Sequence, residues 1–417
     1  MANETRFIEY KQTLTNEFLK TVSAFANYGT GDIIFGVSNT GEYVPIDNLE
    51  EMRLSIENKI NDSISPIPNY QFEELGETGP LKLTVYKGES TPYRYKGKAY
   101  RRADTADVDA GVIETNRLTL EGMHRSYDST PATTQDLTFE LLTEKLKTEL
   151  ALNEVSSDIF RSLSLLDPTH GYNKAAELLA DNNTYPGLTM VRFGTSISQI
   201  LDDVRIEHIS LLEEYKRAVD VYRRYYQYEV IEGAYRETVS AIPEVAFREA
   251  VANALVHRTW DVHAAVRVSM FEDHIEITSP GGLPTGLTET EYWDGLISIL
   301  RNPILADIFH RLNIIDQIGT GILRIKEAYQ AYHVKPTYKV TENTITLILP
   351  VVNVDQHLNE TESRVYQLLV QKQSAKRPEL EMELSLSKDT CIRALNSLIA
   401  KILISKTGSG RATRYIV

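Results

Sequence analysis

The residues Glu249-Ala250-Val251-Ala252-Asn253-Ala254-Leu255-Val256-His257-Arg258 decide the fold that the sequence predicts. Glu249, Asn253 and His257 recur at every fourth position, which places these polar side chains on one face of a helix. The alanine, valine and leucine side chains between them suit the packed sides of the same helix. Polar groups on such an apolar helix are costly to bury unless they are engaged. The row could position a hydrated magnesium ion and a water beside a nucleotide triphosphate.

The composition bounds the class of protein. At 417 residues, the chain is long enough for two to four domains. A hydrophobic content of 42% and a charged content of 24% are typical of soluble globular proteins, and no apolar run approaches the ~20 residues that span a bilayer. The sequence begins without the pattern of a secretory signal, and Cys391 is the single cysteine, which excludes an intrachain disulfide. We therefore expect a cytoplasmic protein, of bacterial type, that does not contact membranes.

Charge is unevenly distributed along this acidic chain. The net charge of −14 argues against a protein that coats nucleic acid along its whole surface. However, the stretch 387–417 holds six basic residues and one acid, and the stretch 93–102 holds five basic residues and no acid. If nucleic acid binds, we expect it at those two places.

Apolar periodicity predicts an α+β arrangement in the first part of the chain. Residues 16–28 read as a helix, 32–37 as a buried strand, and 93–102 as a hairpin that turns at Gly97. The stretch 126–136 is rich in Ser, Thr, Pro and Asp and reads as a linker.

The remaining segments predict a mixed domain followed by a small helical one. Residues 137–179 read as helical with a break at 167–171, and 199–228 as containing a long amphipathic helix. Residues 266–271 and 274–279 alternate like paired strands, and 340–352 is a further strand region. The last segment predicts three helices followed by a β-hairpin, which is the order of a winged helix, and they lie at 362–371, 377–384, 387–401 and 402–416.

The polar row resembles the N-box of the GHKL ATPase superfamily, in the variant found between a Schlafen-type AlbA-2 domain and a winged helix. Two glycine clusters and the triplet Arg301-Asn302-Pro303 agree with that resemblance. It implies that Asn253 ligates Mg²⁺, that Glu249 orients or deprotonates the attacking water, and that His257 supports the row. It further implies that backbone N–H groups of the glycine clusters approach the phosphates of ATP. The nucleotide-binding residues that the resemblance implies are Ser279, Gly281, Gly282, Gly319, Thr320 and Gly321.

One departure concerns the adenine. The aspartate with which the GHKL family reads this base corresponds to Ser279 here, and a hydroxyl bonds the exocyclic amine more weakly than a carboxylate does. No Gly-x4-Gly-Lys-Ser/Thr pattern occurs in the sequence, which argues strongly against a P-loop helicase motor.

The N-terminal sequence resembles the Schlafen AlbA-2 domain, in residues 4–11, 23–27 and 31–37. Nuclease members of that family use two glutamates, which match Glu4 and Glu9, and an aspartate, for which this chain has Asn39. Such a cluster would hold a divalent metal, with Lys11 neutralising developing charge. Losing one anionic ligand weakens a site for a hard metal, although Asp32 or Asp47 could substitute. The resemblance therefore favours a nuclease-like fold that binds nucleic acid without cutting it.

Two groups of basic residues are candidates for contacts with nucleic acid. In the first, tyrosines alternate with cations, so ring faces could stack on bases; the alternative is a solvated edge hairpin protected by charge. In the second, the start of a recognition helix would meet base edges and the hairpin would meet phosphates; the alternative is a dimerisation module. The candidates are Tyr93, Arg94, Lys96, Lys98, Arg101 and Arg102 in the first group, and Lys388, Thr390, Arg393, Lys406, Arg411 and Arg414 in the second.

The sequence thus predicts an α+β multidomain chain. We expect a Schlafen AlbA-2 domain at 1–125, a linker at 126–136, a helical segment with a GHKL (Bergerat) α/β sandwich at 137–355, and a winged helix-turn-helix at 356–417. The expected function is that of an ATP-responsive, DNA-binding transcriptional regulator that uses ATP and Mg²⁺, forms homo-oligomers, and has RNA as an alternative partner. A second hypothesis is an ATP-gated, metal-dependent nuclease with Glu4 and Glu9 catalytic. A third is a scaffold in which both sites have decayed.

Overall fold

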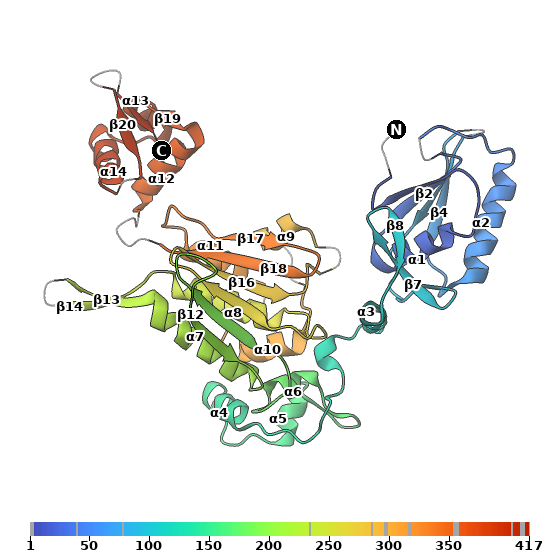
Figure 1. Cartoon of the computed structure of the whole chain (residues 1–417), viewed down its shortest axis with the longest axis horizontal. Coiled ribbons are helices and arrows are strands. Elements are labelled where there is room, and N and C mark those ends of the chain that lie inside the picture. Colours follow the sequence, from blue (N-terminus) through green and yellow to red (C-terminus); the bar gives the residue numbers. More distant parts are fainter. Residues whose placement is uncertain are drawn as a thin grey trace. The chain divides into compact units, whose positions relative to one another are not determined.

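The computed structural model describes residues 4–38, 41–76, 79–232, 235–284, 287–295, 299–315, 319–352, 358–401, 403–408 and 413–416. The chain divides into two compact units, of which the first is Met1–Thr130 and the second comprises Pro131–Leu283 and Leu287–Val417. Both units mix helices with sheets (Figure 1). The α+β multidomain class predicted from the sequence is therefore confirmed. Among the described residues, no helix is long and apolar enough to cross a membrane.

The first unit is built from two four-stranded sheets that share one buried helix. The first sheet has the order β1-β2-β5-β4, with bounds Ile8–Lys11, Gly31–Phe35, Leu81–Val85 and Tyr70–Glu74. The second has the order β3-β6-β7-β8, with bounds Ile64–Ser65, Arg94–Tyr95, Lys98–Ala103 and Ala106–Asp109. Helix α1 (Phe18–Tyr28) contacts strands of both sheets and is buried over most of its length. The outer elements are α2 (Leu49–Ser63), α3 (Val112–Gly122) and the 3-10 turn η1 (Tyr127–Ser129).

Gly31 shows why α1 and β2 meet so closely. A Cβ atom at Gly31 would lie 2.5 Å from the Phe25 ring, so only glycine lets the ring of α1 pack on the start of β2. Strand β2 pairs in parallel with β1, where Glu9 lies opposite Ile33. This pairing places β1 beside the core and fixes where its polar side chains lie.

The second unit contains a six-stranded sheet in the order β12-β11-β15-β16-β18-β17. Only the β11–β15 pair is parallel. Helices α7 (Leu211–Tyr226) and α8 (Glu244–Val256) pack on the sheet and on each other. The strand bounds are Ile200–Ile206, Leu188–Phe193, Val266–Met270, His274–Pro280, Thr344–Pro350 and Thr337–Val340, in sheet order.

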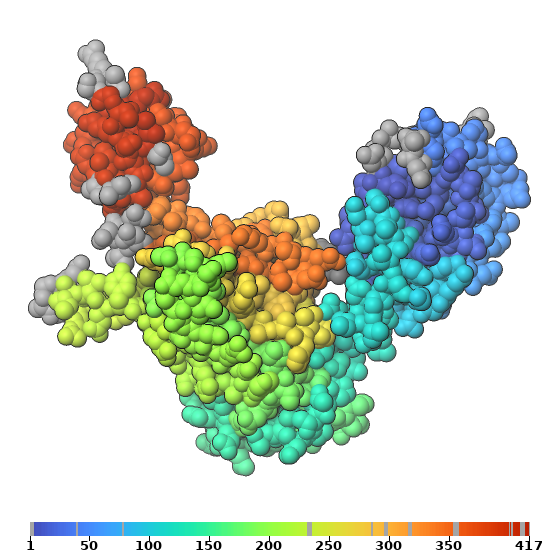
Figure 2. Space-filling view, viewed as in Figure 1, coloured from blue at the N-terminus to red at the C-terminus, as the bar shows by residue number. Residues whose placement is uncertain are grey.

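Smaller elements complete this part of the second unit. The hairpin of β13 (Gln227–Glu232) and β14 (Tyr235–Ser240) extends away from the body of the sheet (Figures 1 and 2). The short strands β9 and β10 form a two-stranded ribbon. The remaining bounds are Glu140–Glu149 (α4), Ser157–Ser162 (α5), Leu166–Asp167 (β9), Gly171–Tyr172 (β10), Lys174–Leu179 (α6), Glu289–Asp294 (α9), Pro303–Arg311 (α10) and Gly321–Ala328 (α11).

One prediction from periodicity was wrong in part, and one strand was not predicted. The segment 137–179 is not helical up to its predicted break, because the helix ends after Glu149 and the next begins at Ser157. The segment 199–228 contains the predicted amphipathic helix as α7, but strand β12, which precedes it, was not predicted. Because β12 is an edge strand with several exposed positions, its apolar residues do not follow a clear period of two.

The end of the second unit consists of three helices and a three-stranded sheet in the order β19-β21-β20. Its core contains Val365, Leu369, Leu395, Leu398 and Cys391. The predicted order of three helices followed by a hairpin is confirmed, with one short additional strand between the first two helices. The bounds are Glu360–Lys372 (α12), Ser374–Ala375 (β19), Arg377–Leu384 (α13), Lys388–Ala400 (α14), Ser405–Thr407 (β20) and Arg414–Ile416 (β21).

Candidate functional site

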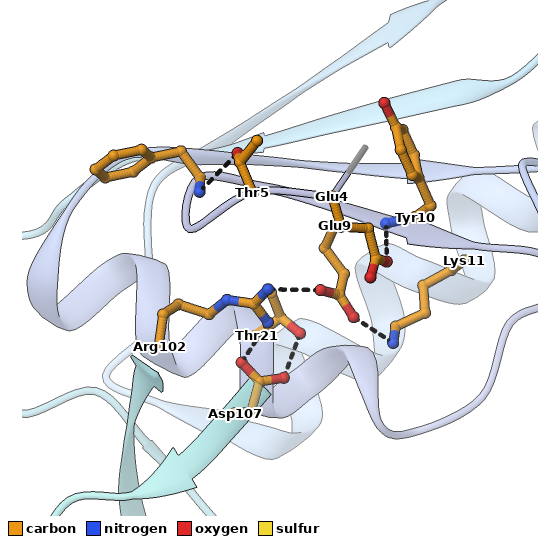
Figure 3. Close-up of polar contacts among 9 residues, drawn as sticks. Glu4, Thr5, Glu9, Tyr10, Lys11, Thr21, Arg102 and Asp107 are labelled. Carbon is orange, nitrogen blue, oxygen red and sulfur yellow. Dashed lines mark hydrogen bonds and ion pairs between the residues drawn. The ribbon is translucent and has the colours of Figure 1, made fainter. Parts of the chain in front are cut away.

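Arg102 of β7 lies between two carboxylates in the first unit (Figure 3). Its guanidinium Nη2 is 2.7 Å from Glu9 Oε2 on β1, and its Nη1 is 2.8 Å from Asp107 Oδ1 on β8. Lys11 Nζ lies 2.6 Å from the other oxygen of Glu9, and Thr21 of α1 donates to Asp107. Burial alone would lower the pKa of Arg102, but its bonds to Asp107 and Glu9 outweigh burial and raise that pKa. The cluster is a buried and nearly neutral ion network.

This network does not fit the divalent metal that the nuclease resemblance implies. Both oxygens of Glu9 are already bonded to cations, and Glu4 Oε1 accepts from the backbone N–H of Tyr10 at 2.9 Å. A hard cation prefers oxygen ligands whose charge is not yet neutralised. In the described part of the chain, no group of three or more His, Cys, Asp or Glu side chains could hold a metal ion.

The substitutes considered for the missing aspartate do not supply a ligand cluster either. Asn39 itself lies outside the described residues. Asp32 accepts from the Thr84 hydroxyl at 2.6 Å, and Asp47 is exposed. We therefore assign no metal to this network.

The basic stretch 93–102 separates into buried and exposed side chains. Strands β6 and β7 form the predicted hairpin, and Lys96 and Gly97 at its turn both have positive φ angles. Two of the predicted nucleic-acid contacts need correction. Tyr93 is 5% exposed because its ring belongs to the hydrophobic core, and Arg102 is 5% exposed because it holds the ion network. Neither side chain can reach a nucleic acid from this position.

The other cations of the stretch differ in their partners. Lys98 pairs with Asp109 at 2.5 Å, and Arg101 pairs with Glu114 at 3.2 Å. Arg94 and Lys96 are exposed, and in the described parts of the chain neither forms an ion pair with a carboxylate. These two side chains are therefore the ones available to an external anion.

Helix α8 carries the polar row, but the row is shorter than predicted. The helix begins after Pro243 and ends at Val256, so His257 is its C-cap residue and not part of the helix body. Burial, and next the Arg301 guanidinium, lower the pKa of His257 from 6.5 to about 4. His257 is accordingly a neutral ring at physiological pH.

Helix α11 covers the polar row of α8. Arg324 of α11 donates to Glu249 Oε1 at 3.0 Å, and Glu249 is 6% exposed. A Cβ atom at Gly321 would lie 2.6 Å from Asn253 Nδ2 and 3.0 Å from Glu249 Oε2. The resemblance implied that Gly321 approaches the phosphates of ATP. In the structure, its missing side chain instead allows two helices to approach closely. Gly319 and Thr320 precede this helix, with Thr320 as its N-cap.

The first glycine cluster is also filled by protein atoms. Gly281 has a φ of +107°, and a Cβ there would lie 1.9 Å from the Thr259 hydroxyl oxygen. A Cβ at Gly282 would lie 2.4 Å from the Glu342 carbonyl oxygen. Ser279 donates its hydroxyl proton to the Ala254 carbonyl at 2.9 Å. The lone pairs of that hydroxyl can still accept a proton from an exocyclic amine.

The triplet Arg301-Asn302-Pro303 serves as the end cap of α8. Arg301 donates to the His257 carbonyl at 2.8 Å and to the Gly282 carbonyl at 2.7 Å. Asn302 is fully buried and donates to the Val256 and Arg258 carbonyls. The last carbonyls of a helix have no partner within the helix, and these two side chains bond to those of Val256 and His257. Sequence reasoning recognised the triplet but missed this role.

The arrangement of α8 and α11 does not fit a magnesium triphosphate. The acid is paired with Arg324, the amide lies so near Gly321 that a Cβ there would clash with it, and the ring of His257 is neutral. A ligand at Glu249 and Asn253 would have to replace the first turn of α11. Arg324 is the site residue that sequence reasoning missed, although its position three residues after Gly321 places it on the same face of α11.

The start of α14 presents the predicted C-terminal candidates. Ser387 caps the helix by accepting from the Thr390 backbone N–H at 3.2 Å, and Lys388, Arg393 and Lys406 are exposed. Arg414 is bonded to Ser374 at 2.6 Å. Arg411 lies outside the described residues. Lys388 and Lys406 are thus exposed without an ion pair among the described residues, whereas Arg393 donates to the Asp389 carbonyl at 3.4 Å.

Comparison with known proteins identifies two domains. Residues 4–111 match the Schlafen, AlbA_2 family, and residues 263–349 match the family described as "Putative ATP-dependent DNA helicase recG C-terminal". The resemblance to a Schlafen AlbA-2 domain and an ATPase-like domain is confirmed. The second match begins after α8, so it contains Ser279, Gly281 and Gly321 but not Glu249 or Asn253. Among the curated proteins, none matches the chain.

Two solved structures are similar to the chain. The crystal structure of the DIP2311 protein from Corynebacterium diphtheriae is 19% identical, with a TM-score of 0.49, over 99% of this chain and 92% of that one. The solution structure of the N-terminal domain of "Putative ATP-dependent DNA Helicase RecG-related Protein" from Nitrosomonas europaea is 23% identical, with a TM-score of 0.19, over 26% of this chain and 84% of that one.

Proposed function

We propose that this chain, which carries a Schlafen AlbA_2 domain and a RecG C-terminal-type domain, is a DNA-binding regulator whose central domain senses a nucleotide. The observation that carries the proposal is the presence of both domains in one chain with exposed, unneutralised cations at two separate places. In a chain with a net charge of −14, such local cations are suited to bind a polyanion.

The C-terminal elements support duplex DNA as one partner. Helix α14 begins with the exposed side chain of Lys388, and Arg393 is exposed five residues later in the same helix. Lys406 lies on β20. In a winged helix, which is our interpretation of residues 356–417, the second helix of the helix-turn-helix enters the major groove and its first residues meet base edges. We place Thr390 and Arg393 at the bases and Lys406 at a phosphate.

The nucleotide response rests on the family match and requires a rearrangement. A triphosphate with Mg²⁺ at Glu249 and Asn253 needs the first turn of α11 to move and Arg324 to release the acid. Such a movement would couple the ligand to the rest of the domain. We further propose that the domain boundaries near 125, 136 and 355 separate the functional parts and that the protein acts as a homo-oligomer in the cytoplasm.

Cleavage of nucleic acid is not part of this proposal. Glu9 is saturated by Arg102 and Lys11, and no observation on the described residues favours the nuclease hypothesis. The scaffold hypothesis is disfavoured because Arg94, Lys96, Lys388 and Lys406 are exposed and carry no ion pair among the described residues.

Electrophoretic mobility shift with labelled duplex DNA tests the proposal. We expect a salt-sensitive shift that Lys388→Gln weakens severalfold, whereas Lys372→Gln, which removes the same charge from a lysine already paired with Glu383, leaves it within about twofold. ATP with magnesium should change the affinity of the full chain. If the chain shifts no duplex at low salt, the DNA-binding proposal is wrong. If both variants bind alike, the start of α14 is not where the duplex binds.

A further inference from the structure

A cavity of about 510 Å³ opens in the first unit beside the β6–β7 turn. It is formed where the end of α2, the segment before β6, the turn itself and α3 meet. Ser63 and Ser65 line one part, Ser90 and Thr119 another, and Arg94 and Lys96 supply the charge. A volume of this order is that of a site for a small ligand.

Several polar side chains of the lining have no partner among the described residues. Among the described residues, no carboxylate pairs with Arg94 or Lys96, and no hydrogen bond engages the side-chain hydroxyls of Ser63, Ser65 or Ser90. Six other cations of the same unit are paired with carboxylates: the pairs are Lys11–Glu9, Lys82–Glu73, Lys87–Glu121, Lys98–Asp109, Arg101–Glu114 and Arg102–Asp107. Arg94 and Lys96 therefore bring two positive charges to the cavity without a neighbouring carboxylate among the described residues.

The chemistry of the lining selects an anion with hydroxyl or amide groups next to it. A guanidinium and an ammonium bind phosphate oxygens, the first with two parallel bonds and the second as a point charge. Serine hydroxyls both donate and accept, so they suit a sugar or a base edge. The cavity lining contains no acidic residue that would repel a phosphate.

We propose that this cavity binds one unpaired nucleotide of a single-stranded nucleic acid, with its phosphate held by Arg94 and Lys96 and its sugar or base against the serine hydroxyls. The inference rests on the proposed function and adds that the first unit binds single-stranded nucleic acid. A hollow of this size takes one nucleotide, whereas a duplex presents its phosphates on a convex surface and keeps its bases stacked inside.

Fluorescence polarisation with a labelled 12-nucleotide single strand tests the proposal in the full chain. We expect the double variant Arg94→Gln with Lys96→Gln to weaken binding by about tenfold and to reduce the slope of log affinity against log salt by about 0.7 for each lost phosphate contact. The matched control is Lys98→Gln, which lies two residues after Lys96, carries the same charge and is paired outside the cavity. It should stay within about twofold of the unchanged chain.

A second variant tests the cavity without changing charge. Ser90 is exposed, so Ser90→Phe should fold normally, fill the hollow and weaken single-strand binding as the double variant does. Unlabelled duplex of equal length should compete at least about tenfold less well than single strand against the Lys388→Gln chain, in which the other site is impaired. A mononucleotide that competes as well as the strand would identify a free nucleotide as the ligand and overturn the proposal.

The outcomes separate this proposal from that of the whole protein. If Lys98→Gln weakens binding as much as the double variant does, or if Ser90→Phe has no effect, the cavity is not the site. If duplex binding remains sensitive to Lys388→Gln while the single strand does not bind, the inference fails and the proposed function stands. If neither nucleic acid binds, both fail.

Discussion

Arg324 donates to Glu249 at 3.0 Å, so the acid that begins the polar row of α8 is already paired with a cation of α11. The pair joins two helices whose surfaces meet at Gly321. It explains how a carboxylate that is 6% exposed is accommodated. It also means that the row, as arranged, serves packing.

Removing Arg324 should destabilise the protein through the acid that it leaves behind. We expect Arg324→Ala to lower the free energy of unfolding by about 1.5–3 kcal/mol, because Glu249 loses its charged partner while staying buried. Glu249→Gln in the same background should restore part of the loss. Urea unfolding of the four proteins of this double-mutant cycle gives the coupling energy. A coupling energy of zero would show that the ion pair between Arg324 and Glu249 does not contribute to the free energy of unfolding.

The same ion pair makes a prediction about nucleotide. If α11 has to move for ATP to bind, Arg324→Ala should raise the affinity for ATP, measured by calorimetry, because one contact that holds α11 in place is gone. An unchanged or weakened affinity would exclude displacement of α11 as the route to a nucleotide site.

Gly321→Ala should test how tightly α11 packs on α8. A methyl group 2.6 Å from Asn253 Nδ2 must displace that side chain or move α11, and we expect a cost of about 1–3 kcal/mol. The control is Gly111→Ala, because a Cβ at that position meets no atom within 4 Å and the φ of Gly111 is negative. The control should change the free energy of unfolding by less than about 1 kcal/mol. Equal losses in the two variants would contradict the close packing.

Arg102 should be far more important to stability than its neighbour Arg101. Arg102→Met leaves Glu9 and Asp107 close together without the guanidinium that joins them, and we expect a loss of about 3–5 kcal/mol. Arg101→Met removes a partly exposed pair with Glu114 and should cost about 1 kcal/mol or less. Thermal unfolding of both variants distinguishes them. Similar melting temperatures would mean that the network contributes little.

The sequence predicted the classes of element better than their roles. Buried helices and strands such as 18–28 and 266–270 follow strong apolar periods, so their positions could be read. The exposed edge strand β12 has no such period and was missed. Spacing placed Glu249 and Asn253 on one face of α8, but it could not show that Arg324, 75 residues later, would occupy the carboxylate. Long-range partners of this kind follow from the packing of α11.

The alternation of tyrosines and cations in residues 93–102 led to a wrong prediction for a related reason. In a strand, alternate side chains point to opposite faces, so Tyr93 and Tyr95 face the core while Arg94 faces outward. The pattern that suggested a stacking surface is therefore the ordinary alternation of a half-buried strand. The exposed half, Arg94 and Lys96, is the part of the prediction that remains available for binding.

His257 should make stability depend on pH in the acid range. Its pKa is about 4 in the folded protein and 6.5 as a free side chain, so the unfolded chain binds the proton more tightly. The stability that the neutral ring of His257 contributes to the folded protein is fully present above pH 6.5, and it is lost as the pH falls from 6.5 through 4. The difference of about 2.5 pKa units corresponds to about 3 kcal/mol at most.

The measurement compares the free energy of unfolding at pH 7.5 and pH 4.5 for the unchanged chain and for His257→Asn. Other groups titrate alike in both proteins, so their effects cancel in the difference. We expect the unchanged chain to lose about 2–3 kcal/mol more than the variant between the two pH values, because asparagine takes up no proton. Equal losses would mean that the imidazole is solvated well enough to carry its charge in the folded protein, and the burial of His257 against Arg301 would then be wrong.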